Sequence, residues 1–123
     1  MPSLAASTIY LFGVTAFLLG VNGLLDPSSF LKQLSAPMDC MPFSAGTSLA
    51  ATAMGIYYTL AAYQENRMFF IATVPMRSLT AVVFWSYGPA WRPGAIWEGG
   101  GAVLTAVALG LEYSRGAGKT KTS

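Results

Sequence analysis

Arg77 and Glu98 are the two charged residues whose positions are best suited to chemistry. Arg77 lies in an apolar stretch that begins at Met68, two residues after Pro75, and Glu98 lies just inside the next apolar run. A charge at membrane depth costs about 2.5 to 3.5 kcal/mol on insertion scales and usually faces protein or water. Arg77 could therefore bind an anionic or carbonyl group of a ligand, with Glu98 acting as an acid or a base.

Both charges also have structural explanations, and the sequence leaves them open. Pro75 removes a backbone N–H and is expected to kink its helix, so Arg77 could instead bond the freed carbonyl groups. Glu98 could stabilise the first turn of a helix. Counting along antiparallel helices separates the two charges by roughly eight residues of depth, or about 12 Å. The sequence therefore predicts two separate sites, with Tyr57 and Tyr58 at the depth of Arg77 and able to hold its guanidinium.

Four further residues complete the set of candidates. Asp26 is another possible acid or base in catalysis, although its position before Pro27 also suits a helix cap. Trp85 and Trp97 could wall a pocket for a flat hydrophobic ligand, or form part of an aromatic belt at the membrane interface. Asn22 could bond a ligand or a neighbouring helix. Together with Tyr57 and Tyr58, the last three form the predicted ligand-binding set.

The composition excludes several classes of site. The sequence has no histidine and a single cysteine, Cys40. Zinc, copper and haem iron favour His and Cys ligands, so we expect no metal site and no cofactor. Without histidine, no Ser-His or Cys-His pair can form. The net charge of +2 comes largely from Arg115, Lys119 and Lys121, which are too sparse for a nucleic-acid surface.

The distribution of apolar residues predicts an integral membrane protein. Of 123 residues, 54% are hydrophobic and 10% are charged, against about 25% charged residues in soluble domains. Four apolar runs, at about 4–25, 44–63, 68–87 and 95–113, approach the roughly 20 residues that a spanning helix needs. The first run has no basic region before it, so we expect a retained helix and not a signal peptide. The predicted domain is 1–113, followed by a mobile basic tail at 114–123.

The predicted fold is all-α: an antiparallel bundle of four transmembrane helices, with a short interfacial helix after the first. Asp26 and Pro27 begin this short helix, and Phe30 and Leu34 share its apolar face. The tight turn at 64–67 predicts that the second and third spanning helices are antiparallel neighbours. Small residues spaced by three or four predict close helix packing along three seams: Gly13, Ala16, Gly20 and Gly23; Thr47, Ala51, Gly55 and Thr59; and Ala102, Ala106 and Gly110.

Four crossings would place both termini on one side of the membrane. That side carries Arg67 and the basic tail, whereas Lys32 and Arg92 lie on the other. Positive charge on short loops favours the cytoplasmic side, so we expect both termini to be cytoplasmic, or on the matrix side in an organelle.

One stretch of sequence supports a family resemblance. Gly20-Val21-Asn22-Gly23-Leu24-Leu25-Asp26-Pro27 runs into the short helix at 30–34, Gly46 and Gly55 lie in the second spanning helix, and Arg77 lies in the third. This pattern resembles the DoxX-like group of small four-helix membrane proteins, including its fungal members of unknown function, over about residues 4–111. The resemblance implies a multi-pass membrane protein. Members of the group lie beside metabolic genes or act as accessory pieces of membrane assemblies.

Two functions remain open at this level. The leading hypothesis is an accessory or hydrophobic-ligand-binding membrane protein whose partners are the lipid bilayer, a hydrophobic small molecule or other membrane-protein subunits, and not nucleic acid. The alternative is a membrane-embedded tailoring enzyme of secondary metabolism, such as a cyclase, an isomerase or an oxygenase-like protein acting on a hydrophobic metabolite. Arg77 would then polarise a carbonyl while Glu98 or Asp26 moves protons. A channel or transporter is less well supported, because one intramembrane charge and four short helices provide little pathway.

Overall fold

Every regular element in the described part of the chain is a helix, which confirms the all-α class. The computed structural model describes the backbone of residues 2–122 and the side chains as far as residue 116. The long helices are α1 (Leu4–Leu25), α3 (Met41–Tyr63), α4 (Arg67–Ser86) and α5 (Arg92–Thr122). The short ones are α2 (Pro27–Gln33) and the 3-10 helices η1 (Met38–Cys40) and η2 (Pro89–Trp91).

Side-chain caps define where several helices begin. Ser3 accepts a hydrogen bond from the Ala6 N–H at 3.0 Å and begins α1. Asp26 accepts one from the Ser29 N–H at 3.3 Å, and Pro27 occupies the first turn of α2. Both caps satisfy backbone donors that the first turn of a helix leaves without partners. The short helix predicted after Asp26 is therefore confirmed.

Glycines bring the backbones of α1 and α3 into direct contact. A β-carbon at Gly13 would lie 2.7 Å from Thr59 Oγ1 and 3.1 Å from the carbonyl oxygen of Gly55. A β-carbon at Gly55 would lie 2.5 Å from the backbone nitrogen of Phe17. No real side chain fits at such distances, so the glycines set the separation of the two helices. The predicted packing face of α1 is confirmed.

The other predicted seams are only partly correct. In the predicted α3 seam, Gly55 and Thr59 pack against α1, whereas Thr47 and Ala51 line a cavity described below. On α5 the buried positions are Ala95, Glu98, Ala102, Thr105 and Ala108, while Ala106 and Gly110 are exposed. The spacing of four residues from Ala102 to Ala106 and Gly110 does not make one packing face, because Ala106 and Gly110 lie on the exposed side of the helix.

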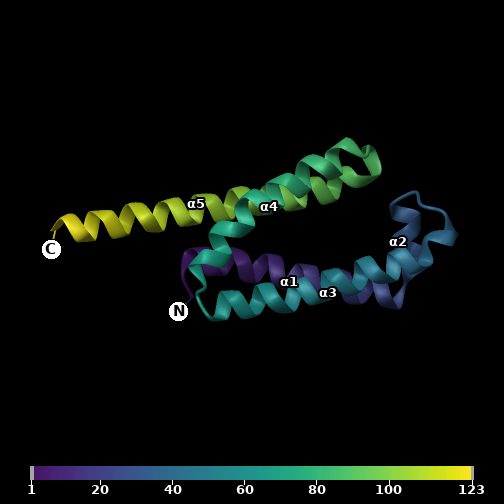
Figure 1. Cartoon of the computed structure of the whole chain (residues 1–123), viewed down its shortest axis with the longest axis horizontal. Coiled ribbons are helices and arrows are strands. Elements are labelled where there is room, and N and C mark those ends of the chain that lie inside the picture. Colours follow the sequence, from purple (N-terminus) through teal and green to yellow (C-terminus); the bar gives the residue numbers. More distant parts are fainter. Residues whose placement is uncertain (1, 123) are drawn as a thin grey trace.

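The four long helices form two antiparallel pairs. Figure 1 shows α1 beside α3 and α4 beside α5, with both termini at the same end. The two pairs meet near the N-terminus and diverge toward α2 and η2. The second and third spanning helices, predicted to be antiparallel neighbours, run in opposite directions (Figure 1), but they touch little beyond their turn, near which the Tyr58 and Phe69 ring centres lie 4.9 Å apart. The turn between them is short, but α3 uses its small residues against α1 and α4 packs on α5.

Polar side chains join the two pairs where they meet. Glu112 of α5 accepts a hydrogen bond from the Ala5 N–H at 2.9 Å and forms an ion pair with Arg67. Thr8 and Thr105 share a hydrogen bond of 2.8 Å between their hydroxyls. These contacts tie α1, α4 and α5 together at one end only. The opposite end is therefore free to open into a cavity.

Three helical segments are long and apolar enough to cross a membrane: Leu4–Leu25, Arg67–Ser86 and Pro89–Gly116. These segments are compatible with the predicted membrane localisation. The remaining long helix, α3, spans 23 residues but has no 18-residue stretch that reaches the mean hydropathy of these three segments. The helix α5 continues to Thr122, beyond the predicted end of the domain at residue 113. The mobility predicted for 114–123 stays a prediction, since the side chains after residue 116 lie outside the described part.

Candidate functional site

Arg77 and Glu98 form a buried ion pair at the centre of the molecule. Arg77 Nε lies 3.5 Å from Glu98 Oε2, and the two residues are only 2% and 5% exposed. The prediction of two separate sites is therefore wrong, and a single charged site lies between the helical pairs.

The turn between α4 and α5 explains why depth counting failed. The predicted spanning helices ended at residue 87 and resumed at residue 95, so the estimate of depth treated 88–94 as irregular. In the structure, the 3-10 helix η2 begins at Pro89 and α5 begins at Arg92. Helical structure thus resumes immediately after the turn. Gly88 lies 11 residues after Arg77 and 10 residues before Glu98, so the two side chains reach the same level. Gly88 itself adopts a φ of 108°, a conformation that L-residues with side chains rarely adopt.

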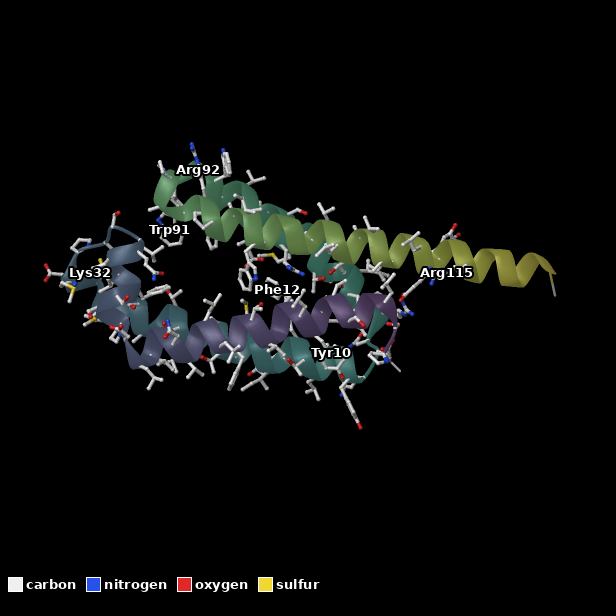
Figure 2. The ribbon with its side chains drawn as sticks, turned by 180° about the vertical axis from the view of Figure 1, so that it is seen from behind. Tyr10, Phe12, Lys32, Trp91, Arg92 and Arg115 are labelled. Atoms are coloured by element: carbon white, nitrogen blue, oxygen red, sulfur yellow. The ribbon has the colours of Figure 1, made fainter. Side chains whose placement is uncertain are left out.

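An aromatic ring of α1 covers the guanidinium. The Cζ atom of Arg77 lies 3.5 Å from the centre of the Phe12 ring. Phe12 stacks on Trp97 with ring centres 4.3 Å apart, and Tyr58 of α3 lies 4.9 Å from Phe12. All four long helices therefore contribute to the site, and Figure 2 shows Phe12 between the two pairs. Sequence reasoning missed Phe12 because one aromatic residue in an apolar run gives no distinct signal.

Gly101 makes room for the arginine head group. A β-carbon at this position would collide with Nη2 of Arg77 and would lie 2.7 Å from its Cζ. The neighbouring Gly100 has nothing within 4 Å of the same hypothetical atom. Within the Gly99-Gly100-Gly101 run, Gly101 is thus the glycine that the charged site requires.

A cavity of about 270 Å³ separates the two helical pairs at their divergent end. Its wall is almost entirely apolar and comes from α1, α2, α3, α4, η2 and α5. Glu98 and Ser48 are polar residues in this wall, and the buried hydroxyl of Ser48 has no hydrogen-bond partner among the described residues. The lining includes two tryptophans, Trp97 and Trp91, and Figure 2 shows Trp91 at this end. The site thus offers a small apolar chamber with few polar groups, as is typical of ligand pockets.

A second cavity, of about 220 Å³, lies between α1 and α5 on the side of Arg77. Phe12 and Trp97 line it together with Arg77 and Gly101. Leu11 and Leu104, also in its lining, are 60% and 52% exposed, so this cavity borders the outer surface. The charged pair therefore has one cavity against its carboxylate and another against its guanidinium, and Trp97 lines both.

Four of the predicted residues lie away from this centre. Asp26 is exposed and caps α2, and Asn22 is exposed near the end of α1. Tyr57 is 62% exposed, and Trp85, at 50% exposed, packs against the Arg92 guanidinium at 4.7 Å. The structure brings together Arg77, Glu98, Tyr58 and Trp97 from the predicted set.

Comparisons with models of protein families, with curated proteins and with solved structures find no match to this chain. A buried arginine and carboxylate beside two small cavities can bind a polar group of an apolar molecule or exchange a proton with it.

Proposed function

We propose that this chain is a multi-pass membrane protein that binds a hydrophobic small molecule between its two helical pairs. The observation that carries this proposal is the apolar cavity of about 270 Å³ with Glu98 and Ser48 in its wall. A cavity of about 150 Å³ lined by apolar side chains can hold benzene. The larger volume suits a molecule of modest size, with most of its surface apolar and one group that can hydrogen-bond.

The surface of the molecule supports four membrane crossings, with α3 as the fourth. This helix lies antiparallel to α1 along a glycine-mediated contact, and its length nearly equals the 22 residues of α1. Its outer face exposes large apolar side chains: Leu49, Ile56, Tyr57 and Leu60. Lipid is the solvent that suits such a face. Lys32 and Arg92 lie at one end of the bundle and Arg115 at the other (Figure 2), which supports termini on the cytoplasmic or matrix side.

Native mass spectrometry of the protein extracted from its own membranes in mild detergent tests the proposal. We expect a copurified small molecule on the natural protein. The variant Ala51→Phe, which fills the cavity from α3, should lose it. The control Ala106→Phe adds the same side chain at an exposed position that lines neither cavity and should retain it. If the Ala51→Phe protein still carried the extra mass of the copurified molecule, binding in this cavity would be contradicted. A stoichiometric protein complex without a small molecule would favour an accessory subunit.

The ion pair beside the cavity favours a tailoring enzyme as the second candidate. Glu98 lines the cavity, so a proton could pass between this carboxyl and a bound metabolite, while Arg77, which lines the other cavity, stabilises the carboxylate form through the ion pair. A cyclase or isomerase of a biosynthetic pathway would use these two residues. Asp26 has no place in this mechanism, because it is exposed as the cap of α2. Turnover lost in Glu98→Gln, with the copurified ligand retained, would support the enzyme over simple binding.

A further inference from the structure

The guanidinium of Arg77 has more donors than the protein satisfies. Its three nitrogens are buried and have no hydrogen-bond partner among the described residues, and the contact with Glu98 is an ion pair at 3.5 Å. Arginine has five N–H donors, and leaving buried donors without acceptors is costly. The ring of Phe12 interacts with the charge but accepts no conventional hydrogen bond. An acceptor is therefore missing from the protein's own side chains.

The cavity of about 220 Å³ between α1 and α5 is the place from which such an acceptor can arrive. Arg77 forms part of its wall, and Gly101, also in the lining, lets the guanidinium lie directly against α5. Leu11 and Leu104 border it on the outer surface, which faces lipid if the proposed topology holds. A molecule dissolved in the bilayer could enter sideways without passing through water.

The depth and charge of the site restrict the acceptor. Arg77 lies ten residues from the start of α4 and nine from its end, which places it about 15 Å from either end of the helix. That is the middle of a hydrocarbon core about 30 Å thick, far from phospholipid head groups. The neighbouring Glu98 already balances the charge of Arg77, so an anion would leave a net negative charge at this depth. A neutral oxygen acceptor avoids that cost.

We propose that the cavity between α1 and α5 binds a neutral, apolar carbonyl compound whose oxygen accepts hydrogen bonds from Arg77. This site does not depend on whether the larger cavity holds a ligand. The chemistry of recognition is one carbonyl group on a hydrophobic body that dissolves in the centre of the bilayer. Phe12, Trp97 and Leu104 supply the apolar contacts.

The test uses benzophenone as the probe and diphenylmethane, which lacks the carbonyl, as the matched competitor. The full chain is reconstituted in lipid nanodiscs, and the probe is added before irradiation. We expect covalent labelling at residues of this cavity, and a carbonyl infrared band lowered in frequency relative to the probe in lipid alone. The ketone should bind about tenfold more tightly than the hydrocarbon, since a hydrogen bond from a charged donor discriminates by at least that much.

Two substitutions make the result specific. Leu104→Trp fills the cavity from its lipid-facing side and should abolish both the labelling and the lowered band, whereas Val107→Trp adds the same ring at an exposed position outside the lining and should leave both unchanged. Arg77→Met should remove the lowered band even where the probe still labels. Equal affinity for diphenylmethane, tighter binding of a fatty carboxylate such as laurate, or labelling that survives Leu104→Trp would overturn the proposal. Leu104 and Val107 lie outside the lining of the larger cavity, and labelling found at Trp97 alone, which lines both cavities, does not count as binding at this site.

Discussion

At the scale of single residues, the charged centre depends on three side chains that meet at one place. Arg77 brings five donors into a region where water is excluded, Glu98 supplies the balancing charge, and Phe12 covers the cation. Breaking such a pair leaves one buried charge uncompensated, whereas removing both charges can be nearly neutral. The energetic role of the pair can therefore be separated from its role in binding.

Arg77→Met alone should destabilise the protein by about 3–5 kcal/mol, because Glu98 then remains buried without a partner. The double variant Arg77→Met/Glu98→Leu should recover most of that loss. Equilibrium unfolding by SDS titration in mixed micelles measures both values. If the double variant lost as much unfolding free energy as the two single variants lose together, the two residues would act independently. That result would contradict the ion pair described.

Gly101→Ala should cost about 1–3 kcal/mol, because its methyl group overlaps the Arg77 guanidinium and forces it to move. Gly100→Ala is the matched control on the adjacent residue, where the added methyl group meets nothing within 4 Å. Thermal unfolding in detergent should separate the two variants clearly. Equal midpoints would contradict the assigned role of Gly101.

At the scale of elements, two helix contacts carry the architecture. The α1–α3 contact is made through glycine backbones, and the α4–α5 hairpin turns at Gly88 so that Arg77 and Glu98 become level. The short helix α2 lies across the end of the α1–α3 pair, and its Phe30, with Leu34 just after it, completes the lining of the larger cavity. The cavity thus results from pairs that pack tightly within themselves and diverge from one another.

Gly20→Ala should destabilise the α1–α3 contact by about 1–3 kcal/mol, since a β-carbon there collides with Thr52 and with the backbone of α3. Gly46→Ala, in α3, is the control because its β-carbon would meet nothing within 4 Å. Unfolding followed by circular dichroism measures the difference. If Gly20→Ala were as stable as Gly46→Ala, the close approach of these helices would be contradicted.

Much of this organisation follows from sequence, and the failures have identifiable causes. The cap at Asp26, the limits of α1 and the glycine face of α1 are local features, fixed by residues near one another in the chain. The helix α4 packs on α5 and little on α3, and this choice depends on which long-range contacts are more favourable. The spacing of residues in the sequence does not predict which contacts those are. Arg77 and Glu98 were placed apart because Pro89 was expected in a loop, whereas proline suits the first turn of a helix.

At the scale of the whole molecule, the charges and the apolar surface suggest how the bundle lies in a bilayer. Both termini lie at the end where Glu112 and Arg67 join the pairs, and Arg115 lies there too. The cavity opens toward the other end, near α2 and η2. A ligand would therefore enter from the lipid or from the side of the membrane that faces α2.

Cysteine labelling should show that α3 crosses the membrane. The native Cys40 lies before α3, so a membrane-impermeant maleimide should reach it from one side of sealed vesicles. Gln64→Cys and Ser114→Cys, each made in a Cys40→Ser background, should react only from the opposite side. Labelling of Gln64→Cys and Cys40 from the same side would show that α3 does not cross, leaving three crossings.

The most direct test of the central claim is saturable quenching of tryptophan fluorescence by 1-bromooctane in nanodiscs. In Trp85→Phe the remaining tryptophans, Trp91 and Trp97, both line the larger cavity. We predict a saturable quenching component above the linear background from lipid partitioning. This component should disappear when Ala51→Phe is added and persist when Ala106→Phe is added. Quenching that rises only linearly with probe concentration, and equally in all three proteins, would contradict ligand binding between the helical pairs.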